Sequence, residues 1–212
     1  PLIIWLHGMG EGGTNSIIPL QGNKVANLAS ETIQKNFGAT GAYVLVPQAD
    51  GFWMQTSSNP DFQSDGIYTP GNSARSYYTE ALFNCIDEFV KSHNEIDPSR
   101  VYVGGCSNGG YMTVNMLIEY PDYFAAAYPI CEAYPDAKID DAKLAALAKN
   151  NIWFTQAQND GTVNPAECDV ATVARLEALG ANVKFNFPAD VHDETGLYFM
   201  RDEAGTLTDL PY

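Results

Sequence analysis

VYVGGCSNGGYMT, residues 101–113, runs from apolar β-branched residues through a glycine-rich turn into a helical pattern. Within it, Gly105-Cys106-Ser107-Asn108-Gly109 matches the pattern G-x-S-x-G. Such a serine lies on a strained strand-to-helix turn, so tight that glycine is needed two residues before it and two after it. A strand pattern precedes the turn and a helix pattern follows it, as this geometry requires. The stretch therefore predicts a nucleophile elbow with Ser107 at its tip.

The five-residue pattern is not specific by itself. With glycine and serine each near 7% of residues, chance produces it in roughly one chain in fifteen of this length. A plain glycine-rich turn between a strand and a helix is the alternative interpretation. The flanking strand and helix are what favour the elbow over that alternative.

Strand and helix patterns alternate along the whole chain. Six short apolar runs predict strands. Where a run is continuously apolar, it indicates a strand buried on both faces of the sheet. Helical stripes lie between them, and repeated strand-then-helix order is typical of a parallel sheet with helices on both faces. The fold class predicted is α/β, of the α/β-hydrolase kind. The predicted strands are Leu2 to Leu6, Ala42 to Val46, Arg100 to Gly104, Phe124 to Ile130, Asn151 to Gln156 and Val183 to Phe187.

The clearest predicted helix follows the second strand, with Ser73 as a possible N-cap and an apolar stripe that includes Cys85. Another stops at Gly180, a residue typical of helix C-termini. Residues 1–212 are expected to form a single catalytic domain. The chain opens directly on a buried strand and has no closing helix after the last one, so we expect edge elements to be missing at both ends.

Composition narrows the classes of partner. The 26 acidic and 11 basic residues give a formal charge of −15, which disfavours nucleic acid and anionic membrane surfaces as partners. The sequence contains no run of 18 apolar residues, so no membrane span is predicted. The four cysteines have no CxxC spacing and stand far from the three histidines, so we predict neither a metal site nor a cofactor.

The cysteines carry two further expectations. Cys85 and Cys106 fall on buried patterns and are expected to be core thiols. Cys131 and Cys168 fall in predicted loops and could pair, which would suit a secreted protein.

Acyl-transfer chemistry needs hydrogen-bond donors for the charge that develops on the carbonyl oxygen. The turn His7-Gly8-Met9-Gly10 follows the first strand, where hydrolases of this class place one such backbone N–H. The second donor is the N–H of Asn108, the residue after the serine. His7 itself is expected to make structural hydrogen bonds in this turn rather than to act as a base.

Asp160 follows the fifth strand and His192 follows the sixth. The chain order Ser, Asp, His is the order that this fold uses for its triad. Parallel strands bring both residues to the same sheet edge as Ser107, where an imidazole could take the serine proton and a carboxylate could orient it. The alternative for Asp160 is a turn residue before Gly161.

Four segments together resemble the esterase family that groups polyhydroxybutyrate-depolymerase-like and feruloyl-esterase-like enzymes: LHGMGEGG, VPQADGFW, YVGGCSNGGYMT and WFTQAQND. The resemblance is strongest to bacterial esterases whose catalytic domain can follow an immunoglobulin-like N-terminal module. It implies Ser107 as nucleophile, Asp160 as acid and the N–H groups of Met9 and Asn108 as the oxyanion hole. It also implies Trp53 as a wall of an acyl or aryl pocket, for which a hydrophobic plug is the alternative.

The sequence departs from this family in one place. In the similar esterases a Gly-His-aromatic-Ser-Trp segment follows the stretch that resembles DVHDETGLY, and its histidine is the base. Here the sequence given ends at Tyr212 without that segment. Either His192 is the base or the base is a histidine beyond Tyr212.

The leading hypothesis is a serine carboxylic-ester hydrolase that acts on a short-chain, aryl or polymer-linked ester through an acyl-enzyme. A prolyl-oligopeptidase-like serine peptidase shares the fold and the triad. A non-catalytic binding module on the same scaffold is the alternative from another class. A thiol mechanism is excluded by register, because Cys106 stands one position before the elbow centre.

Overall fold

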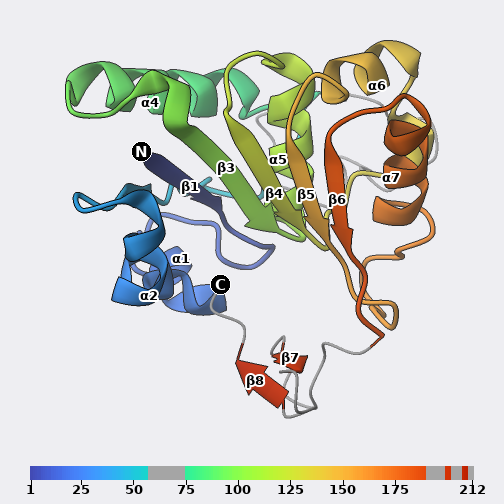
Figure 1. The fold of residues 1–212 in the computed structure, drawn as a ribbon, viewed down its shortest axis with the longest axis horizontal. Coiled ribbons are helices and arrows are strands. Elements are labelled where there is room, and N and C mark those ends of the chain that lie inside the picture. The colour runs from blue at the N-terminus through green and yellow to red at the C-terminus, as the bar shows by residue number, and fades with distance from the viewer. Residues whose placement is uncertain (57–74, 190–198, 202–206, 210–212) are drawn as a thin grey trace.

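The computed structural model describes residues 1–56, 75–189, 199–201 and 207–209. Six parallel strands form the main sheet, in the order β2-β1-β3-β4-β5-β6 (Figure 1). The strands of this sheet are β1 (Leu2–Leu6), β2 (Tyr43–Leu45), β3 (Val101–Cys106), β4 (Ala126–Ile130), β5 (Ile152–Thr155) and β6 (Val183–Asn186). A separate antiparallel pair joins β7 (Phe199–Arg201) to β8 (Leu207–Asp209).

Helices cover both faces of the sheet, as the alternation of patterns predicts (Figure 1). The α-helices are α1 (Ile18–Gln21), α2 (Glu31–Gln34), α4 (Thr79–Ser92), α5 (Asn108–Glu119), α6 (Asp141–Leu147) and α7 (Asp169–Ala178). The 3-10 helices are η1 (Gly22–Ala29), η2 (Lys35–Phe37), η3 (Pro98–Arg100) and η4 (Asp136–Lys138).

Successive side chains of a strand point to opposite faces of the sheet, so the residues of β1 contribute alternately to the two apolar layers. Its residues Leu2, Ile4 and Leu6 are fully buried in the larger apolar core, with side chains of α4, α5, α6 and α7. Ile3 and Trp5 point to the opposite face and pack with Val25 and Leu28 of η1. A central strand buried on both sides reads as a continuous apolar run, which is why LIIWL was recognisable in the sequence.

Helix α5 lies at the centre of the larger core. Every residue from Asn108 to Leu117 is buried, so this helix is covered on all sides rather than on one face only. It contacts β1, β3 and β4 on one side and α4 and α6 on the other. The start of α5, which carries the elbow, is therefore held from all directions.

The predicted strands are all present: β1 has the predicted bounds, and the ends of the others differ by at most two residues. Strand β3 runs on to Cys106 rather than stopping at Gly104, because Gly104 and Gly105 pair with both β1 and β4 in the middle of the sheet. Helix α7 ends at Ala178 and Gly180 has φ of 72°, in agreement with the predicted helix end. The proposed N-cap Ser73 lies outside the described residues.

The cysteine expectations were wrong in two respects. Cys85 is exposed, because α4 buries Thr79, Leu82 and Ile86 and turns Cys85 away from the sheet. Cys131 and Cys168 are buried and form no disulfide, so the pairing suggested from their loop positions is not formed. Cys106 is buried, as predicted.

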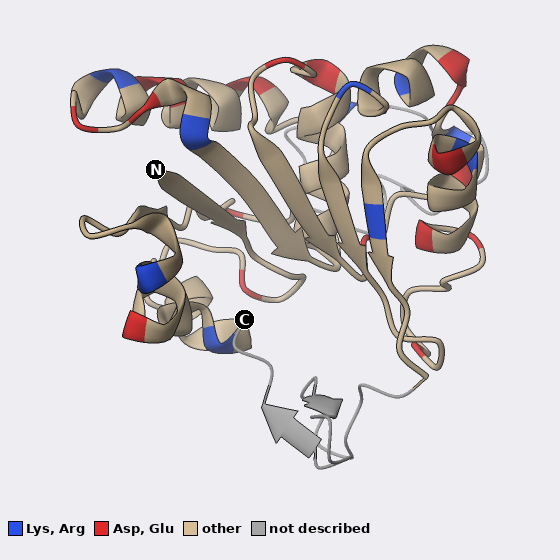
Figure 2. Cartoon of the chain, viewed as in Figure 1, with Lys and Arg blue, Asp and Glu red and all other residues tan. Residues whose placement is uncertain are grey.

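Apart from Lys184 on β6, the charged residues around the main sheet lie on helices and loops, and strands β1 to β5 carry none (Figure 2). Acidic residues appear on several of these peripheral elements rather than in one block. Within the part of the chain that the structure describes, no helix is long and apolar enough to span a membrane.

Candidate active site

Ser107 joins β3 to α5 with φ of 55° and ψ of −113°. A positive φ is uncommon for a residue other than glycine and persists only where the surroundings enforce it. From Val103 to Leu117 every residue is buried except Ser107, which is partly exposed. The strained elbow geometry predicted from the sequence is confirmed, and it brings one serine to the surface in an otherwise covered segment.

Close packing against β1 enforces this conformation. A Cβ atom on Gly109 would lie 1.9 Å from the carbonyl oxygen of Leu6 and 2.7 Å from that of His7. On the other side, the Ser107 N–H donates to the Ile130 carbonyl at the end of β4, at 2.9 Å. The elbow is thus held between the carboxyl ends of its two neighbouring strands.

His7 follows β1 and is fully buried. Its Nδ1 lies 2.8 Å from the Gly8 carbonyl and its Nε2 accepts from the Ala49 N–H at 3.1 Å, an arrangement that fits the neutral ring with its proton on Nδ1. Burial lowers the pKa of His7, with a smaller opposing effect from its bond to Gly8. Both nitrogens are engaged within the turn, so His7 has the structural role expected from the sequence.

Trp53 connects the two segments predicted to supply oxyanion donors. Its backbone N–H donates to Oδ1 of Asn108 at 2.7 Å, and its indole Nε1–H donates to the His7 carbonyl at 3.1 Å. Its ring lies 4.8 Å from the ring of His7 and 5.9 Å from that of Tyr78, measured between centroids. Trp53 is 2% exposed, so it braces the elbow and the glycine-rich turn in addition to any contact with a substrate.

A cavity of about 350 Å³ lies beside Trp53, between the segment after β2 and the first turns of α4. It is lined by Pro47, Gln48, Ala49, Asp50, Trp53, Tyr78, Ala81, Leu82 and Cys85. Most of this lining is apolar, with polar groups of Gln48, Asp50 and Tyr78 among it. The indole therefore does border a hollow, as the pocket-wall prediction requires.

Asp160 follows β5 and is half-buried. Its Oδ1 accepts the N–H groups of Thr162 at 2.8 Å and Val163 at 3.0 Å, and its Oδ2 accepts Nε2 of Gln156 at 3.1 Å. These bonds make Asp160 a turn residue, the alternative raised from the sequence. They also fix the direction of a carboxylate whose Oδ2 retains capacity for a further donor, so the two interpretations are compatible.

Backbone bonds join the loops at the carboxyl edge of the sheet. The Cys131 N–H donates to the Thr155 carbonyl at 2.7 Å, the Gln156 N–H to Asn186 at 3.0 Å and the Gln158 N–H to Pro188 at 3.0 Å. The segments after β4, β5 and β6 therefore lie side by side. His192 is outside the described residues, four positions beyond Pro188 in the sequence.

A buried pair of carboxyl groups, not anticipated from the sequence, lies behind this edge. Glu132 and Asp169 are both 0% exposed, and Glu132 Oε1 and both Asp169 carboxyl oxygens have no donor within the described residues. Burial is the main cause that raises the pKa of Glu132 to about 8, and burial followed by the charge of Glu132 raises that of Asp169. Both shifts favour the protonated, uncharged carboxyl groups in the folded protein. Glu132 directly follows an apolar strand, which is the one sequence signal that could have drawn attention to it.

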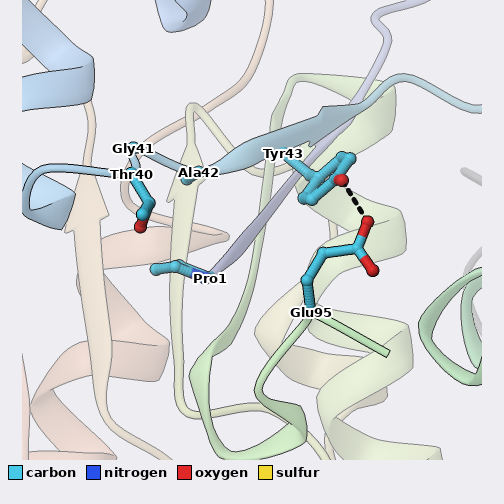
Figure 3. A pocket seen from close by; sticks show the side chains of 6 residues that line it. All are labelled: Pro1, Thr40, Gly41, Ala42, Tyr43 and Glu95. Carbon is cyan, nitrogen blue, oxygen red and sulfur yellow. Dashed lines mark hydrogen bonds between the residues drawn. The ribbon is translucent and has the colours of Figure 1, made fainter. Parts of the chain in front are cut away.

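A larger cavity, about 480 Å³, lies at the opposite end of the sheet (Figure 3). Pro1, which precedes β1, and Tyr43, which starts β2, line it together with Glu95. The Glu95 carboxylate accepts a hydrogen bond from the Tyr43 hydroxyl. Open α/β sheets bind ligands at the carboxyl ends of their strands, and this hollow is at the amino ends. We therefore place the candidate active site at Ser107 and not here.

The parallel sheet with its helical layers and the strained serine after β3 define an α/β-hydrolase fold. No group of three or more His, Cys, Asp or Glu side chains able to hold a metal ion occurs among the described residues. The sequence model of the prolyl oligopeptidase family of peptidases matches residues 76–134, which include the elbow.

Two comparisons point to ester hydrolases. The chain is 38% identical to poly(3-hydroxyalkanoate) depolymerase C of Paucimonas lemoignei over 88 residues, which are 42% of this chain and 20% of the depolymerase. The crystal structure of a thermostable esterase is similar with a TM-score of 0.71 and 27% identity, over 89% of this chain and 46% of the esterase. The chain thus spans less than half the length of either protein.

More distant structures share the fold. SOBER1 of Arabidopsis thaliana has a TM-score of 0.61 at 19% identity, over 88% of this chain and 87% of SOBER1. The acylaminoacyl peptidase of Pyrococcus horikoshii has a TM-score of 0.58 at 15% identity, over 90% of this chain and 32% of the peptidase.

Replacing Gly109 by alanine should prevent the elbow from forming. The added Cβ would collide with the Leu6 carbonyl, a backbone atom that cannot move without distorting β1. We expect Gly109→Ala to lower the free energy of unfolding by about 3 kcal/mol or more, measured by denaturant titration. Gly161→Ala is the matched control, because a Cβ there would meet nothing within 4 Å. Equal stability of the two variants would contradict the packing described.

The buried carboxyl pair predicts a pH-dependent stability. A folded-state pKa of Glu132 raised to about 8 favours the folded protein at low pH, and this contribution is lost as pH rises from about 4.5 through 8. Glu132→Gln keeps an acceptor for the Tyr134 N–H, which lies 2.5 Å from Oε2, and should therefore gain stability relative to wild type across this range. Denaturant titrations at pH 5, 7 and 9 measure this, with the exposed Glu167→Gln as control. A stability difference independent of pH would contradict the assignment.

Proposed function

We propose that this chain is the catalytic part of a serine carboxylic-ester hydrolase that works through an acyl-enzyme at Ser107. The observation that carries the proposal is Ser107 itself, which is strained, partly exposed and placed where β3 meets α5. A binding module has no need for a strained elbow, and backbone strain of this kind costs of order 1–3 kcal/mol. The similarity to a depolymerase and to an esterase supports ester hydrolysis.

In the proposed reaction, Ser107 Oγ attacks the ester carbonyl while a histidine takes its proton. The N–H groups of Met9 and Asn108 would then donate to the oxyanion. Neither N–H has a hydrogen-bond partner within the described residues, which supports this role. The histidine returns the proton to the leaving alcohol, and water then hydrolyses the acyl-serine by the reverse sequence of proton transfers.

Asp160 is proposed to orient the histidine through Oδ2. The bonds from Gln156, Thr162 and Val163 hold this carboxylate in one direction, as an orienting acid requires. His192 remains our proposed base, and the bond between Gln158 and Pro188 brings the start of its segment beside the loop of Asp160. A histidine from elsewhere in a longer protein is the competing source of the base.

The substrate proposed is a short-chain, aryl or polymer-linked ester, whose acyl or aryl group occupies the cavity beside Trp53. This cavity is apolar in most of its lining. The backbone N–H of Trp53, whose side chain forms one wall, donates to the side chain of Asn108, the residue after the nucleophile. Neither a nucleic acid nor a membrane is proposed as partner, given the net charge of −15. An N-terminal accessory module is proposed from the family resemblance alone. The cysteine pattern does not support secretion, because Cys131 and Cys168 form no disulfide with each other.

A serine peptidase of the prolyl oligopeptidase kind is the second candidate, favoured by the family match over residues 76–134. The two functions separate when p-nitrophenyl acyl esters and a proline peptide anilide are assayed side by side. Turnover of the anilide with little turnover of the esters would favour the peptidase.

Mutation of the proposed triad should remove ester hydrolysis. Ser107→Ala is expected to lower kcat for p-nitrophenyl butyrate by about 10³-fold or more, because only the oxyanion donors and binding would remain. Asp160→Asn should lower kcat by about 10²–10⁴-fold, while the exposed Asp122→Asn leaves it unchanged. Turnover at the wild-type rate by Ser107→Ala would end the proposal.

The base is tested separately in the full-length protein. His192→Ala should cost about as much as Ser107→Ala, because triad members act as a unit and their losses do not add. A loss of tenfold or less would remove His192 from the triad and favour a histidine from another segment.

Filling the cavity beside Trp53 should change substrate preference. Ala81 lines this cavity, and Ala81→Leu is expected to lower kcat/KM for aryl and longer acyl esters by about tenfold, with acetate esters less affected. Ala178→Leu, an exposed change on α7, is the control. Equal effects of Ala81→Leu on all esters would show that the cavity does not hold the acyl or aryl group.

A further inference from the structure

Glu11 lies in the glycine-rich segment after β1, residues 7–13, and its carboxylate points back toward the turn at Gly8. Oε2 accepts the Gly8 N–H at 2.7 Å, and Nδ2 of Asn23 donates to Oε2 at 3.1 Å and to Oε1 at 3.3 Å. The carboxylate is half-buried, and burial raises its pKa, while the bonds from Gly8 and Asn23 act in the opposite direction. It is a partly desolvated acid without a basic partner in any ion pair among the described residues.

The space for this carboxylate is built into the neighbouring segment. A Cβ on Gly22 would lie 1.4 Å from Glu11 Oε1, so only glycine at that position admits the observed arrangement. Asn23 has φ of 49°, in the left-handed region that asparagine tolerates better than most residues. A residue without a side chain and a neighbour with positive φ, both in η1, thus accommodate a single side chain from the turn.

The main chain of the turn is fixed independently to the segment after β2. Nε2 of Gln48 donates to the Glu11 carbonyl at 2.8 Å, and the Gly13 N–H donates to the Ala49 carbonyl at 2.8 Å. These contacts hold the far end of the turn, and His7 holds its start through Ala49. Gly8, Met9 and Gly10 lie between the two anchored ends. Two side chains hold Gly8 there: His7 Nδ1 contacts its carbonyl at 2.8 Å, and Glu11 accepts its N–H at 2.7 Å.

We infer that Glu11 is a positioning residue for the oxyanion hole, an inference that rests on the proposed ester hydrolase function. By accepting the Gly8 N–H, its carboxylate fixes the His7–Gly8 peptide, which adjoins the peptide that carries the Met9 N–H. The Met9 N–H has no partner within the described residues and is left as the donor available to a developing oxyanion. Glu11 therefore determines which backbone N–H of the turn faces the substrate, and it does so without contact with the substrate.

Oxyanion donors act only when they are held at the position that the charge will occupy. Losing one donor outright costs about 10²–10³-fold in kcat, so a donor that remains present but loosely held should cost less. Binding of the uncharged ground-state ester depends little on that donor. The signature of a positioning role is thus a fall in kcat at nearly constant KM.

The experiment compares Glu11→Ala and Glu11→Gln with wild type and with the exposed control Glu31→Gln. Kinetics with p-nitrophenyl butyrate, affinity for a trifluoromethyl ketone that forms an oxyanion on the enzyme, and thermal unfolding are measured for each. Glu11→Ala should lower kcat and the affinity for the ketone by about 10- to 100-fold, with KM changed by less than about threefold. Glu11→Gln retains an acceptor oxygen for the Gly8 N–H and should recover most of both.

Asn23→Gly is the second variant, in case Glu11→Ala does not fold. It suits the positive φ, removes the amide that holds the carboxylate and should lower kcat by a smaller factor in the same direction. Loss of thermal stability with kcat and ketone affinity unchanged would overturn the inference and leave Glu11 as a structural residue only. A wild-type protein that turns over no ester would overturn the proposed function, and the inference with it. If the wild-type protein hydrolyses the ester and Glu11→Ala is equally active, the inference about Glu11 is overturned while the proposed function stands.

Discussion

The contact between the start of α5 and the end of β1 is the constraint on which the candidate site depends. Gly109 approaches the carbonyl groups of Leu6 and His7 so closely that no side chain fits between them. With the helix held there, and with the Ser107 N–H bonded to Ile130, the chain can turn from strand to helix only through a strained residue. The same contact brings the glycine-rich turn after β1 beside the serine, because His7 and Gly8 follow Leu6 directly.

Around this contact the site consists of segments that leave neighbouring strands of one sheet. Trp53 ties the segment after β2 both to Asn108 and to His7, so the elbow and the turn share one brace. Backbone bonds then link the segments after β4, β5 and β6, and with them the loop that carries Asp160. Because each of these segments is anchored to its neighbours, the polar groups at this edge are preorganised before any substrate arrives.

The fold and the elbow were predictable because their signals are local. An apolar run such as LIIWL and a glycine spacing such as GCSNG can be recognised from neighbouring residues alone. The features that escaped prediction depend on pairs far apart in the chain. Glu11 bonds to Asn23 twelve residues away, and the charge of Glu132 after β4 acts on Asp169 at the start of α7, so neither pair has a sequence pattern. Cys85 was wrongly predicted to be buried. The apolar stripe of its helix, traced in the sequence at three- and four-residue steps, is wider than the face of α4 that the sheet covers.

Covalent labelling tests the central claim most directly, because it asks whether Ser107 is an activated nucleophile without assuming a substrate. The full-length protein is treated with a fluorophosphonate, its intact mass is measured and the modified peptide is identified by fragmentation. We predict one adduct per chain, located at Ser107, and none in Ser107→Ala or in protein unfolded before treatment. Folded protein that takes up no probe, or takes it up at another residue while Ser107 stays free, would contradict the account.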